Sequence, residues 1–234
     1  MLAGHGPQST VERVSELLPL FLLQTVLFPD MLLPLHIFEP RYRLLVRRAI
    51  ERERPFGVVL IRSGTEVGTT AEPHQIGAEA KILAVSPLAD GRSYIVVRGG
   101  RRFAIEKIIA DAEPYLLGRV SYLDESEGDH ADELARGALD AFGQYLVAVM
   151  AVTDDERGDR AVMTELAGAP PRTVAYRIAA GLAVDASERQ RLLESPSDAD
   201  RLEAERRLLE RETALMNDLL VRLRAHGESR PALN

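Results

Sequence analysis

The chain has 234 residues, enough for one large domain or two small ones at about 150 residues per domain, and its 46% hydrophobic and 28% charged residues are typical of globular proteins. It has no cysteine, which excludes disulfide scaffolds, thiolate zinc sites, iron–sulfur clusters and cysteine nucleophiles. The formal net charge of −7 argues against nucleic acid and anionic membranes as partners, because binding to either needs clustered Lys and Arg.

The first part of the chain predicts a flexible start and two buried strands. The amino terminus lacks a basic segment followed by an apolar run and a cleavage site, so we expect a flexible segment over residues 1–14 and a cytoplasmic protein. Residues 17–35 are apolar enough for a membrane helix, but proline recurs within them. Two short strands joined by a turn at Pro29 and Asp30 fit this segment, without a membrane span.

A helix and a series of strands are predicted next. Pro40 suits the first position of a helix, and the amphipathic pattern continues to Arg54. Asp90 and Gly91 form a hairpin signal between two strand patterns. Glycines within the strands indicate the bulges and bends of a small barrel. We therefore expect a mostly antiparallel β-domain with one inserted helix over residues 15–124, with strands at 56–63, 76–88, 93–109 and 115–123.

The second half of the sequence predicts helices. A polar, acidic segment at 125–133 is typical of a linker, and we expect a helical domain over 134–226 and a flexible tail over 227–234. Ser195 and Pro196 fit the N-cap and the first position of the last helix. The expected helices cover residues 134–149, 172–182, 187–194 and 198 to about 224.

Large apolar residues repeat every seven positions along the last predicted helix, at Leu202, Leu209, Met216 and Leu223. Glu205 falls where a coiled coil would need a second apolar position, as does Glu212, so the pattern favours packing within a helix bundle. A helix of about 27 residues spans roughly 40 Å, more than one compact bundle needs. We therefore expect its far end to project or to pair, with a homo-oligomer formed through residues 198–225.

The sequence contains no recognisable catalytic set. It has no Walker-type phosphate loop, and no G-x-S-x-G motif marks a nucleophilic serine. The histidines are scattered, and His36 with Glu39 gives two potential ligands where zinc needs three or four. We expect no enzyme activity, no cofactor and no metal.

One long stretch resembles a known family. The family resemblance is carried by LPLFLLQTVLFPDMLLPLHIFEPRYRLLVRRAI at 18–50, by IGAEAKILAVSPLADGRSYIVVRGGRRFAI at 76–105, and by RTVAYRIAAGLAVDASERQRLLESPSDADRLEAERRLLERE at 172–212. These segments are similar to the amino-terminal substrate-binding domain of Lon proteases, in the style of stand-alone LON-domain proteins. The string FPxxxLPLxIFEPRYR is the most specific part, because helix or strand periodicity alone would not dictate its prolines and aromatic residues.

The resemblance implies an α+β fold, with a PUA-like, mostly antiparallel β-barrel followed by a helical bundle that ends in a long helix. It also implies a role in recognising protein substrates for degradation. In full-length Lon an ATPase and a Ser–Lys peptidase follow this region, and the present sequence shows neither motif. The expected function is therefore that of a non-catalytic module that binds unfolded or misfolded protein segments, with a protease or chaperone as a further partner.

Capture of such segments needs apolar surface ringed by polar groups. The expected substrate-binding residues lie around the predicted turn and in the corner that follows it: Phe28, Met31, Leu32, Leu33, Leu35, His36, Phe38, Glu39, Arg41 and Tyr42. Packing in the core is the alternative for each apolar residue, and hydrogen bonds that fix the corner are the alternative for Glu39 and Arg41.

Two other functions stay open from the sequence. PUA-like folds also bind RNA, which would need a basic groove built from Arg98, Arg101, Arg102 and Arg119 and salt-sensitive binding. A small ligand bound in the mouth of the barrel is the other alternative.

Overall fold

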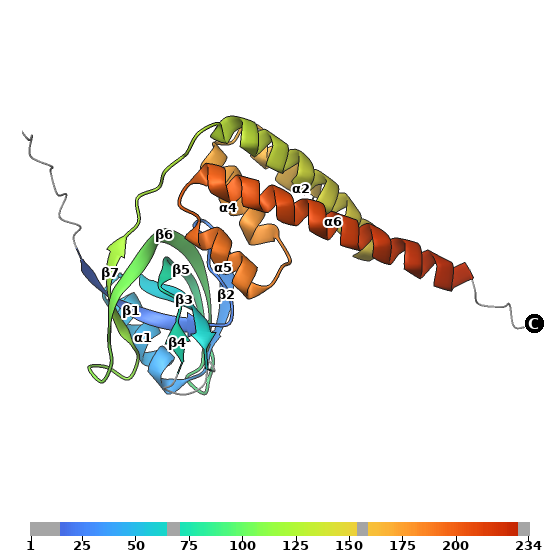
Figure 1. Ribbon diagram of the computed structural model, residues 1–234. Coiled ribbons are helices and arrows are strands. Elements are labelled where there is room, and N and C mark those ends of the chain that lie inside the picture. Colours follow the sequence, from blue (N-terminus) through green and yellow to red (C-terminus); the bar gives the residue numbers. More distant parts are fainter. Residues whose placement is uncertain (1–14, 65–70, 154–158, 229–234) are drawn as a thin grey trace, which may run out of the picture.

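The computed structural model describes residues 15–64, 71–153 and 159–228, so the predicted flexible segment at 1–14 and most of the predicted tail lie outside the described residues. The described chain forms a β-barrel followed by a set of helices (Figure 1). The barrel part contains β1 (Glu16–Leu23), β2 (Leu32–Ile37), α1 (Pro40–Glu51), β3 (Phe56–Ser63), β4 (Glu72–Pro73), β5 (Ile76–Pro87), β6 (Ser93–Ile109) and β7 (Leu117–Tyr122).

Strand pairing closes the sheet into a barrel. The strands follow the order β1-β7-β6-β5-β3, and β3 pairs with β1 again, in parallel, to complete the ring. The other pairings are antiparallel, which confirms the predicted mostly antiparallel barrel. β1 and β2 are not neighbours, although they are joined by the predicted turn, because β2 pairs with β6. The buried Val26, Leu27 and Phe28 belong to the connection between these two strands.

The predicted hairpin and a predicted bulge are confirmed. Leu88 donates its N–H to the carbonyl of Arg92 across the turn at 2.8 Å, and Gly91 has a φ of 79°. Further along the same pair of strands, Gly100 and Arg101 of β6 both lie opposite Glu79 of β5. This β-bulge adds one residue to β6. Odd-numbered residues after it therefore point to the opposite face of the sheet from odd-numbered residues before it.

The second part contains the helices α2 (Ala131–Thr153), α3 (Asp159–Leu166), α4 (Pro171–Gly181), α5 (Ala186–Glu194) and α6 (Asp198–Glu228). α2 begins three residues earlier than expected, and α3 was not predicted. In Figure 1 α2 and α6 run side by side, and α6 extends beyond the other helices. No helix among residues 15–64, 71–153 and 159–228 is long and apolar enough to span a membrane.

The start of α6 differs from the sequence prediction. The N-cap is Ser197, whose hydroxyl oxygen accepts a hydrogen bond from the N–H of Asp200 at 3.1 Å, so Pro196 lies before the cap. The predicted linker is pinned to this end of the helix: Asp198 and Ala199 donate their N–H groups to the carbonyls of Ser126 and Glu127, both at 2.9 Å. The linker is therefore an ordered part of the junction between barrel and helices.

One hydrophobic core crosses this junction. Two clusters lie on opposite faces of β1 and β3, one of them beneath α1, and a third collects the buried faces of the helices together with Val26, Phe28 and Leu60 of the barrel part. Because the same cluster is built from both parts, the helices are packed against the barrel rather than tethered beside it.

Candidate functional site

The predicted site begins at the turn after β1, which is fixed against β6. Asp30 donates its N–H to the carbonyl of Gly99 at 2.9 Å, and Gly99 donates back to the carbonyl of Met31 at 2.9 Å. A Cβ atom at position 99 would stand 1.9 Å from the carbonyl oxygen of Phe28, so only glycine allows this approach. The turn therefore has a defined position, and so have the side chains that leave it.

Three of the predicted site residues are core residues. The side chains of Phe28, Leu35 and Tyr42 are buried, and Leu33 packs against the core of the barrel. Phe21 of β1 and Tyr42 of α1 stack in the core between strand and helix with 3.9 Å between ring centroids. We leave these four residues out of the candidate surface, because their side chains contact the interior and do not line the groove described below. Met31 also packs against the core, but it lines that groove.

The outward face of β2 carries the exposed members of the predicted set. Strand alternation directs Leu32, Pro34 and His36 to one face, and Leu32 is 54% exposed. Tyr94 lies opposite His36 on β6, and the two rings stack with 4.7 Å between centroids. Phe38 continues the same face at 5.6 Å from the ring of His36. Tyr94 was not predicted from the sequence, because its place beside β2 depends on the register between the strands.

A groove adjoins this face where the barrel meets the helices. Its volume is about 360 Å³, and Met31 and Leu32 of the barrel part form one wall. The opposite wall is largely apolar and comes from Phe142 and Leu146 of α2, Val162 of α3 and Gly181 of α4, with Arg177 as its charged member. We call the combined feature the apolar surface; it consists of Met31, Leu32, His36, Phe38, Tyr94 and the residues of this groove.

The polar residues of the predicted set fix the corner after β2. Arg41 donates from Nε to Glu39 at 2.9 Å, and its guanidinium lies 4.4 Å from the centre of the Tyr42 ring. These contacts support the alternative in which Glu39 and Arg41 hold the corner in place. Among the described residues no group of three or more His, Asp or Glu side chains is arranged to hold a metal ion.

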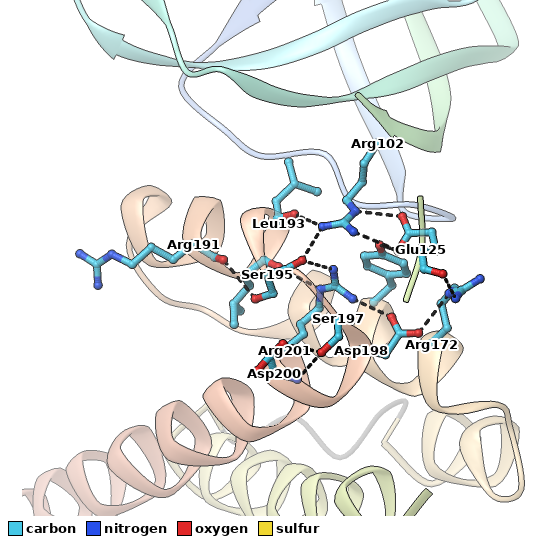
Figure 2. A network of polar contacts seen from close by, with 12 residues as sticks. Arg102, Glu125, Arg172, Arg191, Leu193, Ser195, Ser197, Asp198, Asp200 and Arg201 are labelled. Atoms are coloured by element: carbon cyan, nitrogen blue, oxygen red, sulfur yellow. Dashed lines mark hydrogen bonds and ion pairs between the residues drawn. The ribbon is translucent and has the colours of Figure 1, made fainter. Parts of the chain in front are cut away.

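A buried polar network joins the barrel to the helices, and no pattern in the sequence indicates it (Figure 2). Arg102 of β6 forms two parallel hydrogen bonds to the carboxylate of Glu125, at 2.9 and 3.1 Å, and donates to the carbonyls of Leu193 and Ser195 at 2.6 and 2.7 Å. Its side chain is 2% exposed. Tyr176 of α4 donates its hydroxyl to Glu125 at 2.8 Å. We call these groups the clamp, because they join the barrel, the linker, α4 and the end of α5.

The charge state of the clamp follows from its contacts. Burial on its own would raise the pKa of Glu125, but the hydrogen bonds from Arg102 and Tyr176 outweigh it and the pKa lies below its ordinary value. Glu125 is therefore ionised and paired with Arg102. Arg102 is therefore not available to bind RNA as the alternative function would require, because its guanidinium is enclosed by protein groups.

A second arginine network continues the clamp at the start of α6. Arg201 is fully buried and donates to the carbonyl of Leu192 and to Asp198, both at 2.9 Å, while Arg172 reaches the other oxygen of Asp198 at 3.1 Å. Figure 2 shows both arginines converging on Asp198. Nearby, Gln190 of α5 donates to the carbonyl of Ile76 in β5 at 2.9 Å. The relative position of barrel and helices, and with it the shape of the groove, is thus fixed by directional bonds.

Comparisons with known proteins agree with this architecture. The family described as the ATP-dependent protease La (LON) substrate-binding domain matches residues 17–211. Lon protease 2 of Herpetosiphon aurantiacus is 31% identical over 185 residues, which are 76% of this chain and 22% of that protein. Lon protease 1 of Hydrogenovibrio crunogenus is 26% identical over 209 residues, 88% of this chain and 25% of that protein. The chain thus spans a quarter or less of these Lon proteases.

Two solved structures share the fold. A Lon N-terminal domain protein from Xanthomonas campestris is 27% identical, with a TM-score of 0.58 over 80% of this chain and 95% of that one. The N-terminal domain of the Mycobacterium avium complex Lon protease superposes with a TM-score of 0.63 at 20% identity, over 83% of this chain and 98% of that one. The second likeness concerns the fold alone.

Proposed function

Because this chain belongs to the LON substrate-binding domain family, we propose that it is a non-catalytic, cytoplasmic module that binds unfolded or exposed polypeptide segments through the apolar surface. Such a module serves protein quality control as an adaptor, by presenting the segments to a protease or a chaperone. The observation that carries the proposal is the exposure of Leu32, Phe38 and Tyr94 on one face that leads into the groove between barrel and helices.

The chemistry of this surface suits unfolded segments. A misfolded protein exposes apolar side chains, and contact with exposed leucine and aromatic side chains removes both surfaces from water. The bonds of the clamp fix the barrel against the helices, which supply the two walls of the groove, so little ordering of the protein accompanies binding. Apolar contacts are also weakly dependent on salt, unlike the phosphate contacts that an RNA-binding function would use.

Substitution of Leu32 by aspartate is expected to weaken binding of a permanently unfolded polypeptide by about tenfold or more, and Phe38→Asp should act in the same direction. Both changes place a charge on the apolar surface without opening the core, since both side chains are about half exposed. The measurement is fluorescence anisotropy of a labelled, carboxymethylated unfolded protein at two salt concentrations, with labelled single-stranded RNA in parallel.

A matched control is Ile50→Asp, because Ile50 is a similarly exposed aliphatic residue on α1, outside the apolar surface. The proposal requires saturable, largely salt-insensitive binding that Leu32→Asp reduces and Ile50→Asp does not. Equal losses in the two variants, or binding of the RNA alone with a steep dependence on salt, would contradict it.

We also propose that the distal half of α6 pairs with the same segment of a second copy. Leu215, Leu219, Val221 and Leu223 are exposed there, whereas Leu202 and Leu209 in the first half are buried in the bundle. Leu219→Glu combined with Leu223→Glu is expected to convert a dimer to a monomer in sedimentation velocity, at protein concentrations where the unaltered chain is dimeric. A monomeric unaltered chain, or a dimer that survives both changes, would refute the pairing.

A further inference from the structure

A second cavity lies on the barrel, away from the apolar surface and the clamp. It has a volume of about 640 Å³ and is bounded by the start of β1, the second half of α1 and the segment that leads into β7. None of its lining residues belongs to the apolar surface, and the proposed function makes no use of it.

The lining of this cavity is part apolar and part polar. Its apolar surface comes from Pro19 and Leu117, which are partly exposed, and from Leu17 at the edge, which is 57% exposed. The buried Leu45 and Ala49 form the base beneath them. Exposed aliphatic surface inside a cavity binds a compact hydrocarbon group by removing both surfaces from water.

The edge of the cavity carries three arginines and two carboxylates, and one of the carboxylates has an arginine partner. Arg48 donates to Glu113 at 2.6 Å and to the hydroxyl of Tyr115 at 3.0 Å. Glu16 keeps its negative charge, because the hydroxyl of Tyr122 lies 3.3 Å away and is held closer to Glu79, at 2.5 Å. No ion pair within the described residues involves Arg52 or Arg54, and with three arginines against two carboxylates the edge has a net charge of +1.

The backbone at the end of α1 brings both of these arginines to the cavity. Arg52 caps the helix, and Glu53 follows in the left-handed region with a φ of 50°. This turn reverses the chain, so that the N–H of Arg54 donates to the carbonyl of Ala49 at 3.0 Å. Arg52 and Arg54 therefore line one cavity from a fixed turn, above the buried Ala49.

We propose that this cavity is a binding site for a carboxylate attached to a compact apolar group. The apolar group covers the exposed parts of Pro19 and Leu117, and the guanidinium groups of Arg52 and Arg54 hold the carboxylate, which matches the planar donor geometry of arginine. A free medium-chain carboxylic acid has this chemistry, and so has the C-terminal residue of a polypeptide that ends in leucine. The site is independent of the proposed function.

Isothermal titration calorimetry on the full chain tests the proposal with two matched pairs of probes. Octanoate is compared with octanol, and an N-acetylated peptide ending in Ala-Leu-Leu with a free carboxylate is compared with its C-terminal amide. We expect at least one carboxylate to bind about tenfold or more tightly than its uncharged counterpart. Binding of octanoate alone identifies a free acid as the source, and binding of the peptide alone identifies a polypeptide C-terminus.

Variants locate the binding. Arg52→Ala with Arg54→Ala should weaken the carboxylate about tenfold and leave the uncharged probe unchanged, whereas Arg43→Ala with Arg47→Ala, which removes the same charge elsewhere on α1, should have no such effect. The inference is overturned if neither carboxylate binds, if charged and uncharged probes bind equally, or if the two double variants lose affinity alike.

Discussion

Substitution of Arg102 by leucine is expected to destabilise the protein by about 3–5 kcal/mol, because it removes one partner of a buried ion pair and leaves the other behind. In the folded protein this single guanidinium satisfies the carboxylate of Glu125 and the carbonyls of Leu193 and Ser195. Leucine satisfies none of them. The lost hydrogen bonds weaken the junction between barrel and helices, since Arg102 lies on β6 and the two carbonyls lie at the end of α5.

Urea unfolding followed by circular dichroism measures this effect, with Arg101→Leu as the matched control. The Arg101 side chain is 64% exposed and its contact with Glu79 is 3.7 Å, so its loss should cost less than about 1 kcal/mol. Adding Glu125→Gln to Arg102→Leu should recover part of the loss, because the unpaired charge is removed. An Arg102→Leu variant within about 1 kcal/mol of the unaltered chain would show that the clamp does not hold the junction.

The contribution of the clamp should also depend on pH in a defined direction. The pKa of Glu125 is lowered in the folded protein, so the carboxyl favours folding at pH values above its ordinary pKa of 4.5. This contribution is lost as the pH falls and the folded carboxyl takes up a proton. The difference in unfolding free energy between the unaltered chain and Arg102→Leu should therefore shrink in acid.

Local patterns in the sequence were sufficient for most of the fold. Pro40 marks the start of α1, Asp90 and Gly91 mark the hairpin, and the glycines mark a bulge, because each of these residues acts on the backbone beside it. The pairing of β2 with β6 could not be obtained in this way, since it joins residues about 60 positions apart. The cap of α6 was misplaced because Ser195 and Ser197 are both competent, and only the hydrogen bond of Ser197 to Asp200 decides between them.

The candidate site was predicted in part. Strand alternation separates the outward Leu32 and His36 from the inward Leu33 and Leu35, and applying it to the whole motif would have removed the buried residues. The far wall of the groove comes from helices more than 100 residues away in the sequence. No local sequence pattern predicts that these helices lie beside β2. Arg102 looked like part of a basic surface, because nothing in the sequence shows that the bulge turns it toward the helices.

Substitution of Glu205 by methionine is expected to stabilise the protein, which is the reverse of the usual effect of altering a buried residue. Glu205 lies on α6 with no exposed surface, and neither carboxyl oxygen has a hydrogen-bond partner. Arg201 lies one turn away, but its guanidinium is directed to Asp198 and to the carbonyl of Leu192. An unsatisfied buried polar group costs about 1–3 kcal/mol, and methionine fills a similar volume without that cost.

The gain should increase with pH. Burial raises the pKa of Glu205 well above 4.5, so between pH 4.5 and the folded pKa the unfolded chain has lost a proton that the folded protein keeps. Stability then falls as the pH rises, by about 1.4 kcal/mol per unit. Unfolding free energies measured at several pH values should diverge between the unaltered chain and Glu205→Met.

The cost of burying Glu205 has two parts: a constant part from the unsatisfied polar group and a pH-dependent part from the titrating proton. Glutamine at position 205 separates them, since it retains a polar group but has no proton to lose. Glu205→Gln should remove the pH-dependent part and keep most of the constant part, whereas Glu205→Met should remove both. If all three proteins show the same dependence on pH, the carboxyl titrates normally and the first half of α6 opens to water. In the sequence, Glu205 stands where a coiled coil would need an apolar side chain, and in the structure its carboxyl is buried within the bundle. The three curves measure the free energy that this burial costs.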